Sequence, residues 1–270
     1  MTKNTLHYFF ILLLFLYTQA SIALGQINTH PKQLIEALQH RKPIEIHRNL
    51  PQTKTFLKTD NTLLKLLGDN PHNQRLIIQF PVSLFNQTLH QCVYLSYSEI
   101  LQKMTLQNTQ FEQPITILLS HITKPINGYN VSFHKTMTLS FSLIDQACLL
   151  QDTNFHSTAN LTSNTFNKSI NLTKSTFEKT ADFSNSTFQQ GINLSWSKFN
   201  KHLNFHHAVF FGNSNLSHAT FHQGIDLSNA SLHGNINLSK SFINGEINLR
   251  NLSITGKRKL DLTRITASKI

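Results

Sequence analysis

Histidines crowd into one stretch of this sequence, and imidazole is the side chain that most often binds a metal ion in proteins. The chain contains 15 histidines in all. The crowded ones are His202, His206, His207, His218, His222 and His233. No HExxH motif occurs, and the cysteines and histidines lack the spacing of a zinc finger. Whether these histidines form a site therefore depends on which of them the fold brings together.

Residues that could carry out catalysis are either absent as motifs or widely scattered. The sequence has no GxSxG, P-loop or GxGxxG motif and no recognisable Ser/His/Asp arrangement. The acidic residues beyond Leu150 are Asp152, Glu178, Asp182, Asp226, Glu246 and Asp261. They are too sparse to predict a pair of catalytic carboxylates. We therefore expect no enzyme activity, no catalytic residues, no metal and no cofactor.

Basic residues form a more suggestive pattern. Lys and Arg total 24 against 13 Asp and Glu, which gives a formal net charge of +11. Such a charge favours anionic partners such as phospholipid head groups, acidic polysaccharide or nucleic acid, although it also keeps a repetitive β-rich surface soluble. One candidate binding surface consists of residues that recur at a constant i to i+22 spacing: Lys174, Trp196, His218 and Lys240.

A second basic group lies near the end of the chain and contains Lys257, Arg258 and Lys259. Charge at an open sheet edge blocks pairing with another edge, and we favour this structural role. Docking of an anion is the alternative.

The same i to i+22 period also predicts the fold. From Leu150 onward, large apolar residues recur in alternating steps of five and six, and four steps make one coil. Residues i and i+22 then stack in columns of uniform type: Leu150, Leu172, Leu194, Leu216, Leu238 and Leu260 in one, and Phe155, Phe177, Phe199, Phe221, Ile243 and Ile265 in the next. The Asn, Ser, Thr and Gly between them are poor helix formers. The pattern therefore predicts an all-β solenoid, or β-helix.

The same columns continue backwards into a region with no visible repeat. Ile78, Ile100, Ile122 and Ile144 form one of them, and only Gly128 breaks the pattern. Roughly 190 residues would make nearly nine coils, and a rod on the order of 40 Å long at about 4.8 Å per coil. We expect the β-helix to span 78–270 and to be best formed over 150–265.

Between the anchors, small residues and an Ile-Asn/Asp-Leu-Ser motif recur. Ser175, Ser186, Ser197, Ala208, Ala219, Ala230 and Ser241 each lie two residues before an anchor. This alternation resembles the pentapeptide-repeat family, in the subtype with alternating five- and six-residue steps. The resemblance implies a right-handed quadrilateral β-helix, with the anchor and the small residue pointing inward. The match is strong from Leu150 to Ile265 and weak from Ile78 to Ile144.

The columns also predict which of the chemically interesting residues lie next to one another. None of the six crowded histidines has another of them one coil before or after it, so we expect no metal site. Cys92 and Cys148 are separated by two and a half coils and so lie on different faces, which predicts two unpaired thiols with Cys148 pointing inward. Columns of asparagine, such as Asn171 and Asn193, are expected to be outward residues that bond to one another.

The beginning of the chain differs from the rest. Lys3 precedes an apolar block over 9–16, and small residues follow up to Ala23 and Gly25. This is typical of a cleaved signal peptide at 1–25, which predicts export to the periplasm or secretion. The alternative is an uncleaved anchor at 6–24 in the inner membrane. Residues 26–77 are expected to cap the first coil with a short amphipathic helix near 31–40 and short strands.

These observations favour a non-enzymatic, exported scaffold or binding protein with a macromolecular, anionic partner: a protein, a polysaccharide or a membrane surface. A secreted effector acting on a host protein is an alternative. Some pentapeptide-repeat proteins are acidic mimics of DNA that engage topoisomerases, but the basic charge and the signal peptide disfavour that function and a nucleic acid partner. A glycan-active β-helix enzyme is disfavoured by the lack of a carboxylate cluster. End-to-end pairing of two copies is a further possibility.

Overall fold

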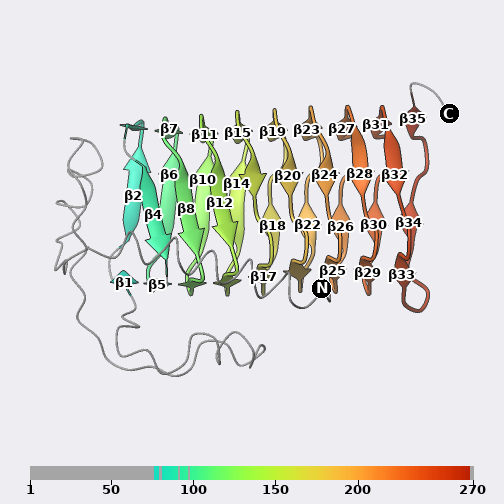
Figure 1. The fold of residues 1–270 in the computed structure, drawn as a ribbon, viewed down its shortest axis with the longest axis horizontal. Coiled ribbons are helices and arrows are strands. Elements are labelled where there is room, and N and C mark those ends of the chain that lie inside the picture. Colours follow the sequence, from blue (N-terminus) through green and yellow to red (C-terminus); the bar gives the residue numbers. More distant parts are fainter. Residues whose placement is uncertain (1–75, 79–80, 91, 97, 268–270) are drawn as a thin grey trace, which may run out of the picture.

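The protein is a four-sided β-solenoid, shown by a computed structural model that describes residues 76–78, 81–90, 92–96 and 98–267. Its strands form four parallel sheets that run the length of a rod (Figure 1). The predicted all-β fold is confirmed. The predicted signal peptide and nearly all of the predicted cap, including its helix, lie outside the described residues. The described part of the chain contains no helix long and apolar enough to cross a membrane.

Each coil contributes one strand to each sheet, and we name the sheets A to D in chain order. Sheet A contains β1 (Leu76–Ile78), β5 (Ser98–Ile100), β9 (His121–Ile122), β13 (Leu143–Ile144), β17 (Thr165–Phe166), β21 (Thr187–Phe188), β25 (Val209–Phe210), β29 (Ser231–Leu232) and β33 (Ser253–Ile254). Sheet B contains β2 (Val82–Phe85), β6 (Met104–Gln107), β10 (Ile126–Tyr129), β14 (Cys148–Gln151), β18 (Ile170–Asn171), β22 (Ile192–Asn193), β26 (Ser214–Asn215), β30 (Ile236–Asn237) and β34 (Leu260–Asp261).

The other two sheets complete the square. Sheet C contains β3 (Thr88–Leu89), β7 (Gln110–Phe111), β11 (Ser132–Phe133), β15 (Asn154–Phe155), β19 (Thr176–Phe177), β23 (Lys198–Phe199), β27 (Thr220–Phe221), β31 (Phe242–Ile243) and β35 (Thr266–Ala267). Sheet D contains β4 (Val93–Ser96), β8 (Ile115–Leu118), β12 (Met137–Ser140), β16 (Ala159–Asn160), β20 (Ala181–Asp182), β24 (Leu203–Asn204), β28 (Gly224–Asp226) and β32 (Glu246–Asn248).

The strand register confirms that residues i and i+22 stack. Phe177 pairs with Phe155 on one side and with Phe199 on the other. The column of isoleucines holds as well, since Ile100 pairs with both Ile78 and Ile122. The solenoid therefore begins well before the visible repeats.

Stacked phenylalanines fill the core along sheet C. The ring centroids of Phe155 and Phe177 lie 4.6 Å apart, and those of Phe177 and Phe199 lie 4.7 Å apart, with the rings within 5° of parallel. These distances match the spacing of hydrogen-bonded strands, about 4.8 Å. Each ring is fully buried and covers the ring of the next coil, which excludes water from the axis of the rod.

The small residues before the anchors point inward, as predicted, and several have a second function. Ser197 donates its hydroxyl hydrogen bond to the carbonyl oxygen of Leu172 at 2.8 Å, and Ser186 does the same to Leu161 at 2.8 Å. The Ser197 hydroxyl also accepts a bond from the backbone N–H of Ser175. Serine at this position therefore adds hydrogen bonds to buried backbone groups of the neighbouring coils.

The asparagine columns bond differently from the prediction. The side-chain oxygen of Asn193 accepts the backbone N–H of Ser195 at 3.1 Å, and Asn215 accepts the N–H of Ser217 at 3.1 Å. Each asparagine thus closes its own turn and does not bond to the asparagine of the next coil. The backbone N–H of the residue two positions later already lies within reach of the short amide side chain, because the turn places it there. At these positions the asparagine bonds to that N–H and not to the neighbouring coil.

Gly128 breaks the column of leucines for a packing reason. A Cβ atom at this position would lie 2.4 Å from Cδ2 of Leu150. The Leu150 side chain therefore occupies the core space that a residue at 128 would otherwise fill.

The last coil departs from the predicted columns. Leu260, which we expected to follow Leu238, pairs with Ile236 instead. Ile265 is likewise displaced, because Ile243 pairs with a residue two positions further along. The loop between β33 and β34 contains two extra residues, so the prediction for Leu260 and Ile265 is wrong.

A turn hydrogen bond accounts for the new register. Asp261 accepts the backbone N–H of Thr263 at 2.9 Å, as Asn237 does from Ser239 in the coil before. This bond, together with one from the Thr263 side chain, holds the pKa of Asp261 below its usual value. The register that keeps this turn places Leu262 at the anchor position, although 41% of Leu262 remains exposed.

Replacement of Gly191 by alanine tests how tightly the coils approach. Gly191 has φ = 84°, and a Cβ atom there would lie 2.0 Å from the carbonyl oxygen of Asn213. We expect Gly191→Ala to lower the free energy of unfolding by about 2 kcal/mol or more, measured by urea denaturation. Gly256→Ala is the control, because Gly256 also has positive φ but has open space around it. Equal losses in the two variants would contradict the close approach.

Candidate functional site

Residues with left-handed backbone recur at two opposite corners of the solenoid. The corner between sheets B and C contains Asn86, Asn108, Asn130, Asp152, Lys174, Trp196, His218, Lys240 and Arg264, all with φ between 50° and 63°. Asparagine and aspartate tolerate this conformation best among residues with a side chain. The first four positions of this corner follow that preference, and the last five do not.

The asparagines of this corner also bond to one another along the rod. Asn108 donates to Asn86 at 2.8 Å, and Asn130 donates to Asn108 at 2.9 Å. At the opposite corner, between sheets D and A, Asn251 donates to Asn229 at 3.1 Å. At that opposite corner Leu119, Phe141, Ser163 and His207 also have positive φ, so asparagine is favoured at such a corner but is not required. From Lys174 onward, the corner between sheets B and C loses its asparagines and the bonds between them, at a cost in conformational energy.

All four predicted residues at this corner are held by the following coil. The backbone N–H groups of Lys174, Trp196 and His218 each donate to a carbonyl oxygen of that coil at 3.1 Å, and the N–H of Lys240 does so at 3.0 Å. These bonds fix the strained backbone, so the side chains leave the corner in a constant direction. The predicted column Lys174, Trp196, His218 and Lys240 is therefore a continuous ridge along the rod.

Trp196 is the most exposed large apolar side chain of the described residues, with 61% of its surface accessible. Its indole ring stacks on the imidazole of His218, with ring centroids 4.2 Å apart and planes within 13°. The Nδ1 atom of His218 is buried and has no hydrogen-bond partner among the described residues. The stack orders the indole while leaving most of it open to solvent.

Further cations join this ridge on the face of sheet C. From β19 to β35, this face and its two edges contain the exposed residues Lys174, Lys179, Lys198, Lys201, Lys240 and Arg264, which we call the basic face. Glu178 is the only acidic residue in the described part of this face, and it bonds to His156 at 2.9 Å. Two other acidic residues lie just outside this face. Asp152 is at the same corner as Lys174 but one coil earlier, and Glu246 belongs to the adjoining sheet D. Positive charge is therefore concentrated on one side of the rod.

The second predicted basic group lies elsewhere. Lys257, Arg258 and Lys259 belong to the loop between β33 and β34, at the corner between sheets A and B. All three are exposed. The structure therefore does not bring them together with Lys174 and Lys240.

The sequence analysis missed a column that contains only histidines and glutamates from His90 to Glu178. It follows the phenylalanine anchors and contains His90, Glu112, His134, His156 and Glu178. His90 bonds to Glu112, and the rings of His134 and His156 stack at 4.7 Å. A search for histidine paired with carboxylate one coil away would have found it. No group of three or more potential metal ligands occurs among the described residues.

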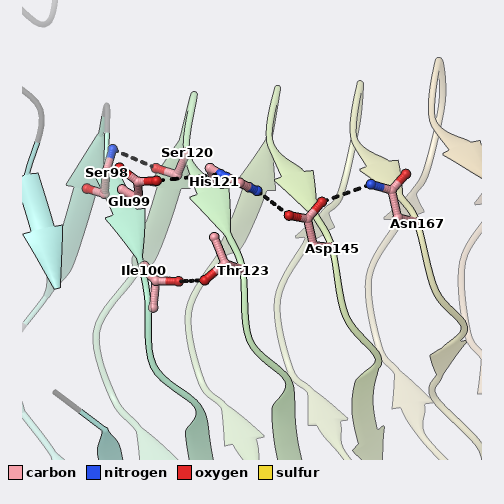
Figure 2. A network of polar contacts seen from close by, with 8 residues as sticks. All are labelled: Ser98, Glu99, Ile100, Ser120, His121, Thr123, Asp145 and Asn167. Carbon is pink, nitrogen blue, oxygen red and sulfur yellow. Dashed lines mark hydrogen bonds and ion pairs between the residues drawn. The ribbon is translucent and has the colours of Figure 1, made fainter. Parts of the chain in front are cut away.

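Figure 2 shows a second polar network, which joins four successive coils. The Nε2 atom of His121 lies 2.5 Å from a carboxylate oxygen of Asp145, and its Nδ1 atom lies 3.8 Å from a carboxylate oxygen of Glu99. Asn167 donates to the second oxygen of Asp145 at 2.9 Å. The side chains of His121 and Glu99 are only 13% and 17% exposed, so water screens these contacts poorly.

The hydroxyl groups of this network are already bonded to backbone. Ser120 donates to the carbonyl oxygen of Leu118 and accepts the N–H of Ser98, while Thr123 donates to the carbonyl oxygen of Ile100. An activated serine would need its hydroxyl bonded to the imidazole. The contacts instead favour a clamp between coils.

The two thiols lie in contrasting surroundings. Both cysteines are free; Cys92 is exposed, whereas Cys148 is buried in the core, as predicted. Burial raises the pKa of the Cys148 thiol to about 12. The reactive form of a thiol is the thiolate, so Cys148 is protected by both its pKa and its lack of access.

Comparison of the chain with protein-family models, curated proteins and solved structures finds no match in any of the three.

Thiol labelling tests the placement of the cysteines. In the native protein at pH 8, a thiol reagent should modify Cys92 only, because the Cys148 thiol is buried and its raised pKa keeps it protonated. Denaturation should expose the second thiol. Mass spectrometry of the labelled peptides distinguishes the two residues, and equal labelling rates in the native protein would contradict the burial of Cys148.

Proposed function

We propose that this chain is a non-enzymatic, exported binding protein that presents the basic face to an anionic macromolecule. The single observation that carries the proposal is the concentration of six exposed cations on sheet C and its edges, against one paired carboxylate. Charge gathered on one face attracts a polyanion over the range of a Debye length and fixes its orientation.

The solenoid suits a binding surface better than a catalytic site. Its core is one continuous cluster of apolar side chains, and the groups of its polar networks bond to backbone or to each other. Outward side chains can therefore change without repacking the interior. The proposal also assigns the solenoid to the pentapeptide-repeat family, which is supported by the inward anchors and the inward small residues two positions before them. Export is supported by the apolar block within 1–25.

Charge reversal with a matched control tests this function. The variant Lys174→Glu/Lys198→Glu/Lys240→Glu should bind a dextran sulfate matrix about tenfold more weakly or worse, since three exposed charge contacts of up to about 1 kcal/mol each are lost. Binding is measured from the salt concentration at elution. The control Lys103→Glu/Lys124→Glu/Lys168→Glu changes the net charge equally, but its three exposed lysines lie at the corner between sheets A and B.

The control should elute close to the wild-type protein. If the two triple variants elute together, net charge and not the basic face governs binding, and the proposal is wrong. Circular dichroism and thermal unfolding show that each variant retains the fold.

A further inference from the structure

The cations of the basic face are spread in two dimensions. Lys174 and Arg264 lie four coils apart, which is about 19 Å at 4.8 Å per coil. Lys174 and Lys179 stand at the two edges of the same coil, at most roughly 16 Å apart along the extended backbone between them. Between them, Lys198 projects from the middle of the sheet. The cations are therefore spread both along the rod and across the sheet, and do not form a single line.

The shape of this patch favours one class of anionic partner. Sheet C runs in a straight row along one long side of the rod (Figure 1). Its charges sit on long, flexible side chains that supply hydrogen-bond donors only. A flat field of mobile cations suits a surface of phosphate groups in fluid arrangement, whereas selection of one glycan or peptide needs convergent polar groups in a concave site.

Trp196 adds an apolar element in the midst of the cations. Tryptophan is enriched at the boundary between lipid head groups and acyl chains, because its ring is apolar and its N–H is polar. Here the indole is 61% exposed, is oriented by stacking on His218, and occupies a left-handed position that tryptophan does not favour. Exposure of the indole is unfavourable in water, and burial in an interface would offset that cost.

We infer that the basic face docks flat on an anionic phospholipid bilayer, with Trp196 inserted at the level of the head groups and the rod parallel to the membrane plane. This inference rests on the proposed function and names its partner. Membrane binding would combine two weak contributions: attraction between the cations and the anionic head groups, and insertion of one aromatic ring. The binding is therefore reversible and weakens with salt.

Tryptophan fluorescence provides a direct readout, because Trp196 is the only tryptophan in the chain. Titration of the full chain with vesicles of phosphatidylglycerol and phosphatidylcholine should shift its emission to shorter wavelength. Vesicles of phosphatidylcholine alone should give little shift. An apolar segment elsewhere in the chain cannot produce this signal, since the probe is in the basic face itself.

Vesicle sedimentation measures the contribution of charge. A lysine near an anionic surface strengthens binding about fivefold, so the Lys174/Lys198/Lys240 triple variant should partition at least about 100-fold more weakly. The variant Lys179→Glu/Lys198→Glu/Lys201→Glu should behave alike and leaves the strained corner unchanged. The control Lys103→Glu/Lys124→Glu/Lys168→Glu should retain binding within about tenfold of wild type, because its lysines lie outside the contact. Trp196→Ala should weaken partition several-fold without changing its dependence on salt.

The outcomes separate this inference from the proposed function. If anionic vesicles neither bind the protein nor shift its emission, while dextran sulfate still distinguishes the two triple variants, the bilayer inference is overturned and an acidic glycan or protein becomes the partner. If neither surface distinguishes the variants, both proposals fail. Equal binding to neutral and anionic vesicles would also overturn the inference.

Discussion

The hydrogen-bonded ladder that joins each residue i to residue i+22 is the constraint on which the whole structure depends. It places equivalent side chains about 4.8 Å apart, inside and outside the rod. Inside, that distance allows Phe155, Phe177 and Phe199 to stack ring on ring. Outside, it would place like charges side by side, which is unfavourable. Some surface columns avoid this by pairing a histidine with a carboxylate, as in the Glu99–His121 pair and the His156–Glu178 pair. Trp196 and His218 likewise separate Lys174 from Lys240.

The same ladder separates stability from surface chemistry. The anchors and the small inward residues fill the core, and turn asparagines such as Asn193 accept backbone N–H groups at the corners. Outward positions that take no part in such bonds or in the polar network of Figure 2 contribute less to the fold, so their residue types are free to vary. The corner between sheets B and C shows where this freedom is used. Its first half is an asparagine ladder that stabilises left-handed backbone, and its second half gives up that ladder for cations and Trp196.

Much of this fold could be predicted because the repeat is a property of the sequence itself. The anchors, the inward position of Cys148 and the ridge of Lys174 and Trp196 all follow from the stacking of residues i and i+22. Other features could not be derived in that way. The displaced register of Leu260 depends on a turn bond at Asp261 that competes with apolar alignment. The basic face combines columns on both edges of sheet C, and a single column does not show which other columns share its face.

The basic face differs from the rest of the described molecule in how little of its charge is balanced by neighbouring side chains. Six cations lie within a few coils, and the one carboxylate among them is already bonded to His156. Elsewhere, histidines, amides and carboxylates of adjacent coils bond to one another, as in the network from Glu99 to Asn167. The chain therefore contains side chains able to balance charge between coils, yet it does not place them here. Uncompensated charge around an exposed, ordered indole is the arrangement expected of a surface completed by an anionic partner.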